Sequence, residues 1–161
     1  MSEAAPLIRV ATDADLDAVR ALLRETWHQV YDPILGAEKV GEVTARWHAR
    51  ELLARELAGP RSSFLVAHEG ERLVAHGYAY PRKPATLVVS RLYVRPGAQR
   101  RGIGQHMLAA LLARHQDAAT LRLFVAAQNE AGLAFWHAKG FSVVSEGVEE
   151  GARVLHMEKH L

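Results

Sequence analysis

Cysteine is absent from this 161-residue chain. Its absence excludes disulfides, thiolate metal ligands and a cysteine nucleophile. The sequence also lacks any apolar run near the roughly 18 residues that a membrane-spanning helix requires. The opening stretch MSEAAPLIRV has an early acidic residue and lacks the basic-then-apolar order of a signal peptide. From these absences we expect a cytoplasmic protein without a membrane partner.

A strong excess of charge is missing as well. Lys and Arg number 20 against 18 Asp and Glu, the formal net charge is +2, and only residues 95–101 are locally basic. A general nucleic-acid binder usually shows a denser basic stripe with interleaved aromatic residues, so we expect no nucleic-acid partner. Apolar residues make up 49% of the chain and no repeat or linker interrupts it, which fits a single domain over residues 1–161.

Hydrophobic periodicity and turn residues divide the chain into alternating elements. Helical spacing predicts helices from Thr12 or Asp13 to about Glu25, over 37–58 with a break near Gly41, from the glycine-rich segment to about His115, and over 129–140. Residues 27–36 are expected to form an irregular aromatic connection. Strand patterns cover 7–10, 63–69, 71–80, 85–94, 120–127 and a closing antiparallel pair over 141–146 and 152–160. The order predicts an α/β fold with a central mixed, mostly antiparallel sheet flanked by helices.

The segment RPGAQRRGIGQHML, residues 95–108, is typical of a loop that places backbone amides against an anion. A nucleotide triphosphate loop is excluded because Ile103 and Gly104 occupy the positions of its lysine and Ser/Thr. A dinucleotide fingerprint is excluded because Met107 stands where its third glycine belongs. What remains is the pattern Q/R-x-x-G-x-G/A over residues 99–104.

With this pattern the chain resembles the GNAT superfamily of N-acetyltransferases. The similarity continues in LYVRP, residues 92–96, and in NEAGLAFWHAKGF, residues 129–141, and the order of elements agrees over nearly the whole chain. The resemblance implies a GNAT-like fold and an enzyme that moves an acetyl group from acetyl-CoA to a primary amine of a small molecule or peptide, by direct attack in a ternary complex. It also implies a homodimer. The alternative is a CoA- or acyl-CoA-binding sensor of the same fold with little or no catalysis.

The glycine-rich segment suits the pyrophosphate of coenzyme A. Gly102 and Gly104 carry no Cβ, so backbone amides that open a helix can approach a phosphate closely. Without a ligand, the same residues would form an ordinary tight turn before a solvated helix. The resemblance adds backbone contacts from the preceding strand to the pantetheine arm, and a contact from Asn129, which also suits a helix N-cap. The expected cofactor-binding residues are Leu92, Tyr93, Val94, Gln99, Arg100, Arg101, Gly102, Ile103, Gly104, Gln105 and Asn129.

The catalytic residues that the resemblance implies are missing. Val88 stands where family members often carry a glutamate base, and Trp136 stands where they carry a tyrosine acid. The weak candidates that remain are Tyr31, His76 and Trp136, although His76 and Trp136 also suit a satisfied half-buried histidine and a core aromatic. His28 and Tyr80 are further possibilities. Amines of modest pKa deprotonate partly in solution, so a strong dedicated base is not required.

Aromatic residues concentrate in the N-terminal helical region. We hypothesise that Trp27, Tyr31, Pro33 and Trp47 line the acceptor pocket, although helix aromatics can equally cover the sheet. The nine histidines do not form a metal motif. His156 and His160 would lie ~13 Å apart in the expected strand, so we expect no metal site.

Overall fold

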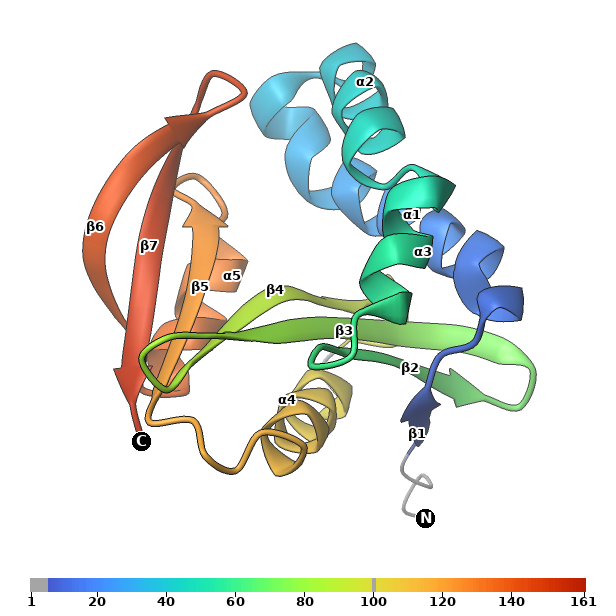
Figure 1. Ribbon diagram of the computed structural model, residues 1–161. Helices are drawn as coiled ribbons and strands as arrows, with labels where there is room; N and C mark the ends of the chain where they lie inside the picture. The colour runs from blue at the N-terminus through green and yellow to red at the C-terminus, as the bar shows by residue number, and fades with distance from the viewer. Residues whose placement is uncertain (1–5, 100) are drawn as a thin grey trace.

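The computed structural model describes residues 6–99 and 101–161, in which seven strands form one sheet of order β1-β2-β3-β4-β5-β7-β6 (Figure 1). Every neighbouring pair is antiparallel except β4 and β5, which confirms the predicted mixed, mostly antiparallel sheet. The strands are β1 (Leu7–Val10), β2 (Ser63–Glu69), β3 (Arg72–Arg82), β4 (Thr86–Val94), β5 (Thr120–Ala126), β6 (Ser142–Glu149) and β7 (Ala152–His160).

Helices cover both faces of the sheet (Figure 1). They are the 3-10 turn η1 (Asp13–Asp15), α1 (Leu16–Leu35), α2 (Ala37–Trp47), α3 (Arg50–Ala58), α4 (Ile103–Ala113) and α5 (Glu130–Ala138). Residues of β2 alternate between two cores, as a strand buried on both faces must. Phe64 and Val66 pack with α1 and α3, whereas Leu65 and Ala67 pack with α4 and α5. None of these helices, nor any other in the described part of the chain, is long and apolar enough to cross a membrane.

The helical region differs from the sequence-based prediction in two places. Residues 27–36 are not an irregular connection, because α1 continues to Leu35 with Pro33 in its last turn. The reason is that Leu23, Trp27 and Tyr31 follow one another at four-residue spacing and so extend the same packed face. The predicted break near Gly41 was also wrong. The chain breaks after α2, where Ala49 is extended and His48 turns inward, to 6% exposure.

Close packing between α4 and the sheet depends on a glycine in β3. A Cβ built on Gly77 would lie 2.8 Å from Cγ of Met107 and 3.1 Å from a terminal methyl of Leu111. Both residues are fully buried in the core under α4. Glycine at position 77 therefore sets how closely α4 approaches the sheet, and with it the position of the N-terminus of α4.

Candidate active site

The sheet opens between its two parallel strands. β4 and β5 are paired only at Thr86–Thr120, Leu87–Leu121 and Val88–Arg122. Beyond Val88, β4 continues along β3 to Val94, while β5 continues along β7 to Ala126. The two strands therefore separate, and the edge of β4 that faces β5 is left without a partner strand over its second half. Such an edge can pair with an extended ligand as a further strand would.

A bulge decides which side chains of β4 face this opening. Between β3 and β4 the register shifts, so that Arg91 pairs with Tyr78 and Val89 pairs with Ala79, with Ser90 as the extra residue. Leu87 and Val89 face the α4 core before the bulge, and Leu92 and Val94 face it afterwards. An extra residue exchanges the two faces of a strand. Arg91 and Tyr93 therefore point to the side covered by α1–α3.

The N-terminus of α4 lies at the end of β4 and is built around glycines. Gly97 and Gly102 have φ of 90° and 77°, a left-handed conformation that side chains rarely adopt. Gly104 is different, since it is helical and a Cβ there would lie at an ordinary 3.6 Å from Phe135 and 3.7 Å from Val94. Neither backbone conformation nor packing requires glycine at 104. A ligand that approaches the first helical amides would require it.

Polar side chains around this helix start are already engaged within the protein. Gln99 donates to the carbonyl of Val94 at 3.1 Å, which closes the loop. Arg101 forms a two-pronged ion pair with Glu69 of β2. Gln105 accepts from the Lys139 ammonium at 2.8 Å, which brings a positive charge from the end of α5 to the same place. Arg100 lies outside the described residues.

Two tyrosines and an asparagine meet beside the strand opening. Asn129 caps α5, because its Oδ1 accepts from the backbone N–H of Gly132 at 3.0 Å. Burial raises the pKa of the Tyr31 phenol well above its ordinary value; the nearby Tyr93 raises it further, and a hydrogen bond with the Asn129 side chain acts in the opposite sense. Burial likewise raises the pKa of Tyr93. Tyr31 of α1 is thus a protonated phenol that contacts two of the predicted cofactor residues.

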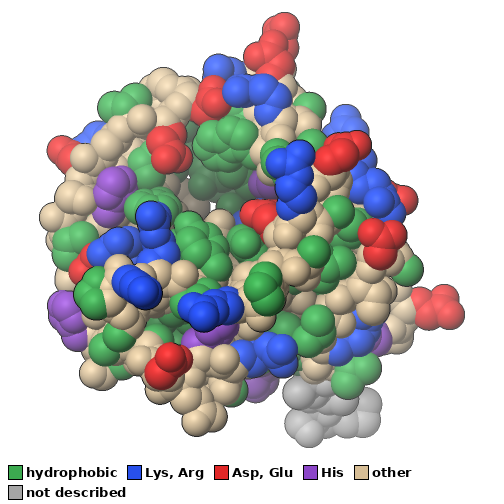
Figure 2. Space-filling view, viewed as in Figure 1, with side chains coloured by type: hydrophobic (Ala, Val, Ile, Leu, Met, Phe, Trp, Pro, Cys, Tyr) green, Lys and Arg blue, Asp and Glu red, His purple; other side chains and the backbone are tan. Residues whose placement is uncertain are grey.

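A hollow of about 380 Å³ opens from this point between the helices and the β6–β7 turn (Figure 2). We call it the central cleft. Its walls come from α1, α2, α3, β4, β5 and the β6–β7 turn, and its aromatic lining includes Trp27, Tyr31, Trp47, Tyr93 and Phe124. Three of the four predicted pocket residues line it, with Trp27 4.4 Å from Tyr31 and 5.7 Å from Trp47 between ring centroids. The fourth, Pro33, is exposed on α1 and does not contribute.

Carboxylates stand at both ends of the central cleft. Glu56 of α3 lies at the inner end, where both its oxygens accept from the guanidinium of Arg91. Glu150 lies at the mouth and pairs with Lys39 at 3.1 Å and Arg46 at 2.9 Å, which ties the β6–β7 turn to α2. Glu149 also lines the cleft, and it has no ion-pair partner within residues 6–99 and 101–161. The mouth therefore offers one unpaired negative charge.

The inner end of the cleft rests on a buried polar network. Arg91 is 7% exposed and donates from Nε to Nε2 of His76 at 3.1 Å, while its guanidinium lies 4.7 Å from the Tyr78 ring centroid. The Nδ1 proton of His76 is donated to the carbonyl of Leu65 at 2.8 Å. Burial and the adjacent Arg91 charge lower the pKa of His76 well below its usual value. Both ring nitrogens of His76 are therefore occupied, and the imidazole supports Arg91 from within the core.

Other residues singled out from the sequence lie away from the central cleft. Trp136 is packed in the core with its ring 5.1 Å from that of Phe141, and does not line the cleft. Val88 is buried in the sheet and does not line the cleft. Tyr80 lies beside Tyr78 on β3, with its ring tilted against that of Tyr78, and His28 pairs with Asp32 along α1.

Sequence reasoning missed several residues that shape the site, namely His48, Glu56, Ser90, Arg91, Phe124, Lys139, Glu149 and Glu150. Only Arg91 left a clear signal, because a cation in the otherwise apolar strand TLVVSRLYV requires a buried partner. Glu56 supplies that partner from a helix 35 residues earlier. The others come from separate elements and are brought together only by the fold.

Comparison with known proteins agrees with this geometry. The family model of the acetyltransferase (GNAT) domain matches residues 31–161. The chain belongs to the GNAT acetyltransferase family. A spermidine N(1)-acetyltransferase of Thermoplasma acidophilum is 27% identical to this GNAT protein over 143 residues, which cover 84% of this chain and 88% of the relative.

Solved structures show how fully the fold is shared. PaiA N-acetyltransferase from Thermoplasma acidophilum, in complex with coenzyme A, superposes with a TM-score of 0.87 at 23% identity and covers 98% of this chain and 100% of its own. The ribosomal-protein-S18-alanine N-acetyltransferase from Escherichia coli superposes with a TM-score of 0.70 at 19% identity, over 95% of this chain and 92% of its own. At these sequence identities, the structural similarity shows that the fold is shared and nothing more.

Membership of the family settles the type of reaction. The protein is an acetyl-CoA-dependent N-acetyltransferase, as the sequence predicted, with acetyl-CoA as its co-substrate. The alternative of a sensor that binds CoA without catalysis is not favoured.

Proposed function

We propose that this GNAT enzyme acetylates a primary amine of a small aliphatic molecule that carries a second positive charge, a polyamine or a compound like one. The observation that carries the proposal is the combination of aromatic faces with the unpaired carboxylate of Glu149 in one cleft. Aromatic rings attract an ammonium group through their π-faces, and a carboxylate fixes it by charge. The spermidine acetyltransferase among its relatives supports the same substrate class.

The acetyl donor binds, in this proposal, across the strand opening and the start of α4. The pyrophosphate lies on the amides of Ile103, Gly104 and Gln105, which begin α4 and, as the first amides of a helix, have no acceptor within it. The pantetheine arm extends along the unpartnered edge of Leu92, Tyr93 and Val94. Gln99 and Asn129 flank the site, and Lys139 adds charge beside Gln105. The thioester then reaches the inner end of the central cleft.

Tyr31 is the general acid that this arrangement supports. In the reaction the amine nitrogen forms a bond to the thioester carbon, the carbon–sulfur bond breaks, and the thiolate needs one proton. Tyr31 lies at the meeting point of β4, α5 and the cleft, and its raised pKa keeps its proton in place. The nitrogen of the newly formed amide then loses its extra proton to the Tyr31 phenolate, which restores the phenol. The ammonium of the substrate loses its first proton to solvent through the open mouth.

The acceptor is tested with a panel of amines and release of free CoA thiol as the readout. Spermidine and diamines are expected to turn over faster than monoamines of equal length and than peptides. Glu149→Gln should raise KM for a diamine about tenfold, since one charge-assisted contact is lost, and should leave KM for acetyl-CoA unchanged. Glu71→Gln, an exposed glutamate in the β2–β3 turn, is the matched control. Equal KM values in wild type and Glu149→Gln, or a preference for peptides, would contradict the proposal.

The homodimer and the cytoplasmic location stay predictions. Val143, Val144 and Val148 are exposed along β6, the outer strand of the sheet, and this apolar edge supports association of two copies. Light scattering at several protein concentrations measures the oligomeric state.

A further inference from the structure

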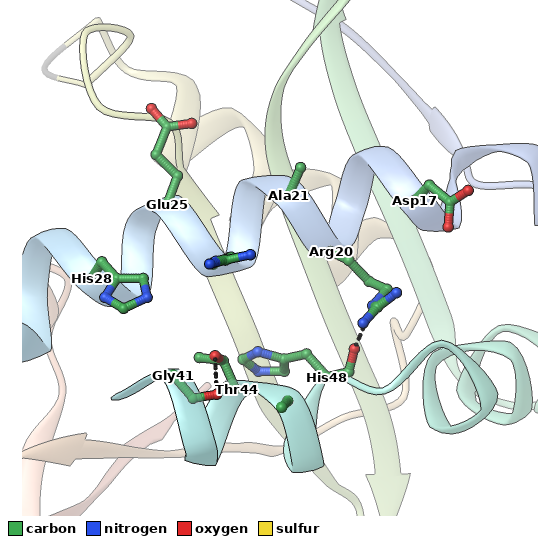
Figure 3. Close-up of a pocket in the computed structure, with 10 residues that line it drawn as sticks. Asp17, Arg20, Ala21, Glu25, His28, Gly41, Thr44 and His48 are labelled. Atoms are coloured by element: carbon green, nitrogen blue, oxygen red, sulfur yellow. Dashed lines mark hydrogen bonds between the residues drawn. The ribbon is translucent and has the colours of Figure 1, made fainter. Parts of the chain in front are cut away.

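A second hollow lies between α1 and α2 (Figure 3). Its volume is about 820 Å³, and its lining comes from residues of α1 between Asp17 and His28 and from residues of α2 and its end between Gly41 and His48. We call it the α1–α2 groove. It contains no residue of β4 or β5 and shares only His48 with the central cleft. It is therefore separate from the site of acetyl transfer.

The charges in the α1–α2 groove do not cancel. The carboxylate of Glu25 accepts from Arg95 after β4, and that of Asp17 accepts from Arg50 of α3, which Asp13 shares, so both acids pair with cations outside the groove. Arg20 uses its Nε for the carbonyl of His48 at 3.1 Å. Arg24, one helical turn further on, has no hydrogen bond or ion pair among the described residues. Two guanidinium groups on one face of α1 are thus left without a carboxylate.

His48 gives the groove an unsatisfied polar group at its base. The side chain is 6% exposed, and its Nδ1 has no hydrogen-bond partner in the described structure. Figure 3 shows the imidazole lying between α1 and α2, close to Thr44. The Thr44 hydroxyl donates to the carbonyl of Val40 and forms no hydrogen bond with the ring. A buried ring nitrogen without a partner is costly, and a polar ligand in the groove would relieve that cost.

We infer that the α1–α2 groove is a second binding site, for a small molecule that carries a carboxylate or phosphate group. Arg20 and Arg24 present the planar N–H forks that bind oxyanions in pairs, and the volume accommodates a metabolite of ordinary size. His48 forms part of both hollows and also lies 5.5 Å from Trp27, between ring centroids, in the wall of the central cleft. A ligand in the groove therefore contacts a residue that the amine acceptor also meets.

Binding is measured on protein saturated with CoA, so that the phosphate cradle at α4 is already filled. Citrate and inorganic phosphate are titrated separately, with sodium chloride at matched ionic strength, while NMR follows the His48 ring signals, assigned with His48→Gln. We expect saturable shifts, about tenfold weaker binding in Arg24→Gln, and loss of saturation in the Arg20→Gln/Arg24→Gln variant. Arg55→Gln, an exposed arginine of α3 outside both hollows, is the matched control and should bind as wild type does.

The result separates the two ligand chemistries and can overturn the inference. Tighter binding of citrate identifies a carboxylate ligand, and tighter binding of phosphate identifies a phosphorylated one. Shifts that chloride reproduces, an equal loss in Arg55→Gln, or no saturable shift with either anion would overturn the site. No amine is present in this experiment, so a negative result would not bear on the proposed amine acceptor.

Discussion

Replacement of Gly104 should weaken CoA binding without weakening the fold. A Cβ at this position would lie at least 3.6 Å from the nearest non-adjacent atoms, those of Phe135 and Val94, which is an ordinary contact distance. Glycine within a helix costs roughly 0.5–1 kcal/mol relative to alanine. Gly104→Ala should therefore leave the free energy of unfolding unchanged or raise it by up to about 1 kcal/mol.

In the proposed CoA site, the same methyl group would stand between the pyrophosphate and the first amides of α4. Each hydrogen bond from an amide to a charged oxygen is worth about 1.5–3 kcal/mol, so loss of one raises Kd about ten- to a hundredfold. Gly104→Asp adds a negative charge beside the phosphate and should abolish binding, although an acidic residue at a helix N-terminus favours the helix itself.

Calorimetric titration with CoA and urea unfolding of the unliganded protein together provide the test. Gly41→Ala is the matched control, because Gly41 is helical with open space around its Cα and lies in α2, away from the cradle. It should gain stability and keep the wild-type Kd. Wild-type CoA affinity in both Gly104 variants would refute the cradle. Loss of stability in Gly104→Ala would refute the claim that packing there has room.

Three further predictions concern packing, acid stability and proton transfer. Gly77→Ala should lower the free energy of unfolding by about 1–3 kcal/mol, measured by urea unfolding, because Met107 must move. Burial lowers the pKa of His76 and of His48 below the value near 6.5 that histidine has in an unfolded chain, so both side chains take up protons on unfolding below that pH. The free energy of unfolding should therefore fall by about 1.4 kcal/mol per pH unit for each histidine as pH drops below about 6.5. A flat profile from pH 7 to 5 would contradict this. Tyr31→Phe should lower kcat about a hundredfold with little change in KM for acetyl-CoA. In the wild type, kcat should not decrease with rising pH below about pH 10, because the Tyr31 phenol stays protonated.

Local sequence patterns were sufficient for most of the elements. The hairpin of β2 and β3, the Gly-rich start of α4 and the Asn129 cap all depend on neighbours within a few residues, and each was confirmed where it was expected. The errors lay in the helical region. Pro33 and Gly41 suggested irregularity, but Pro33 falls in the last turn of α1 and Gly41 is an ordinary helical residue. Tertiary packing of one continuous apolar face outweighed both local signals.

The sequence by itself determined the family, because the family is carried by short motifs, and from the same motifs it predicted a glycine cradle at α4 and the lack of the family's usual acid and base. The tertiary structure alone decided which side chains meet in the cleft. One extra residue at Ser90 turns Arg91 and Tyr93 toward the helices, and a break after α2 turns His48 inward. Glu149 reaches the same cleft from the end of β6, the edge strand of the sheet. A bulge exchanges the faces of the strand beyond it and a helix break redirects the chain, and neither is visible in a local sequence pattern.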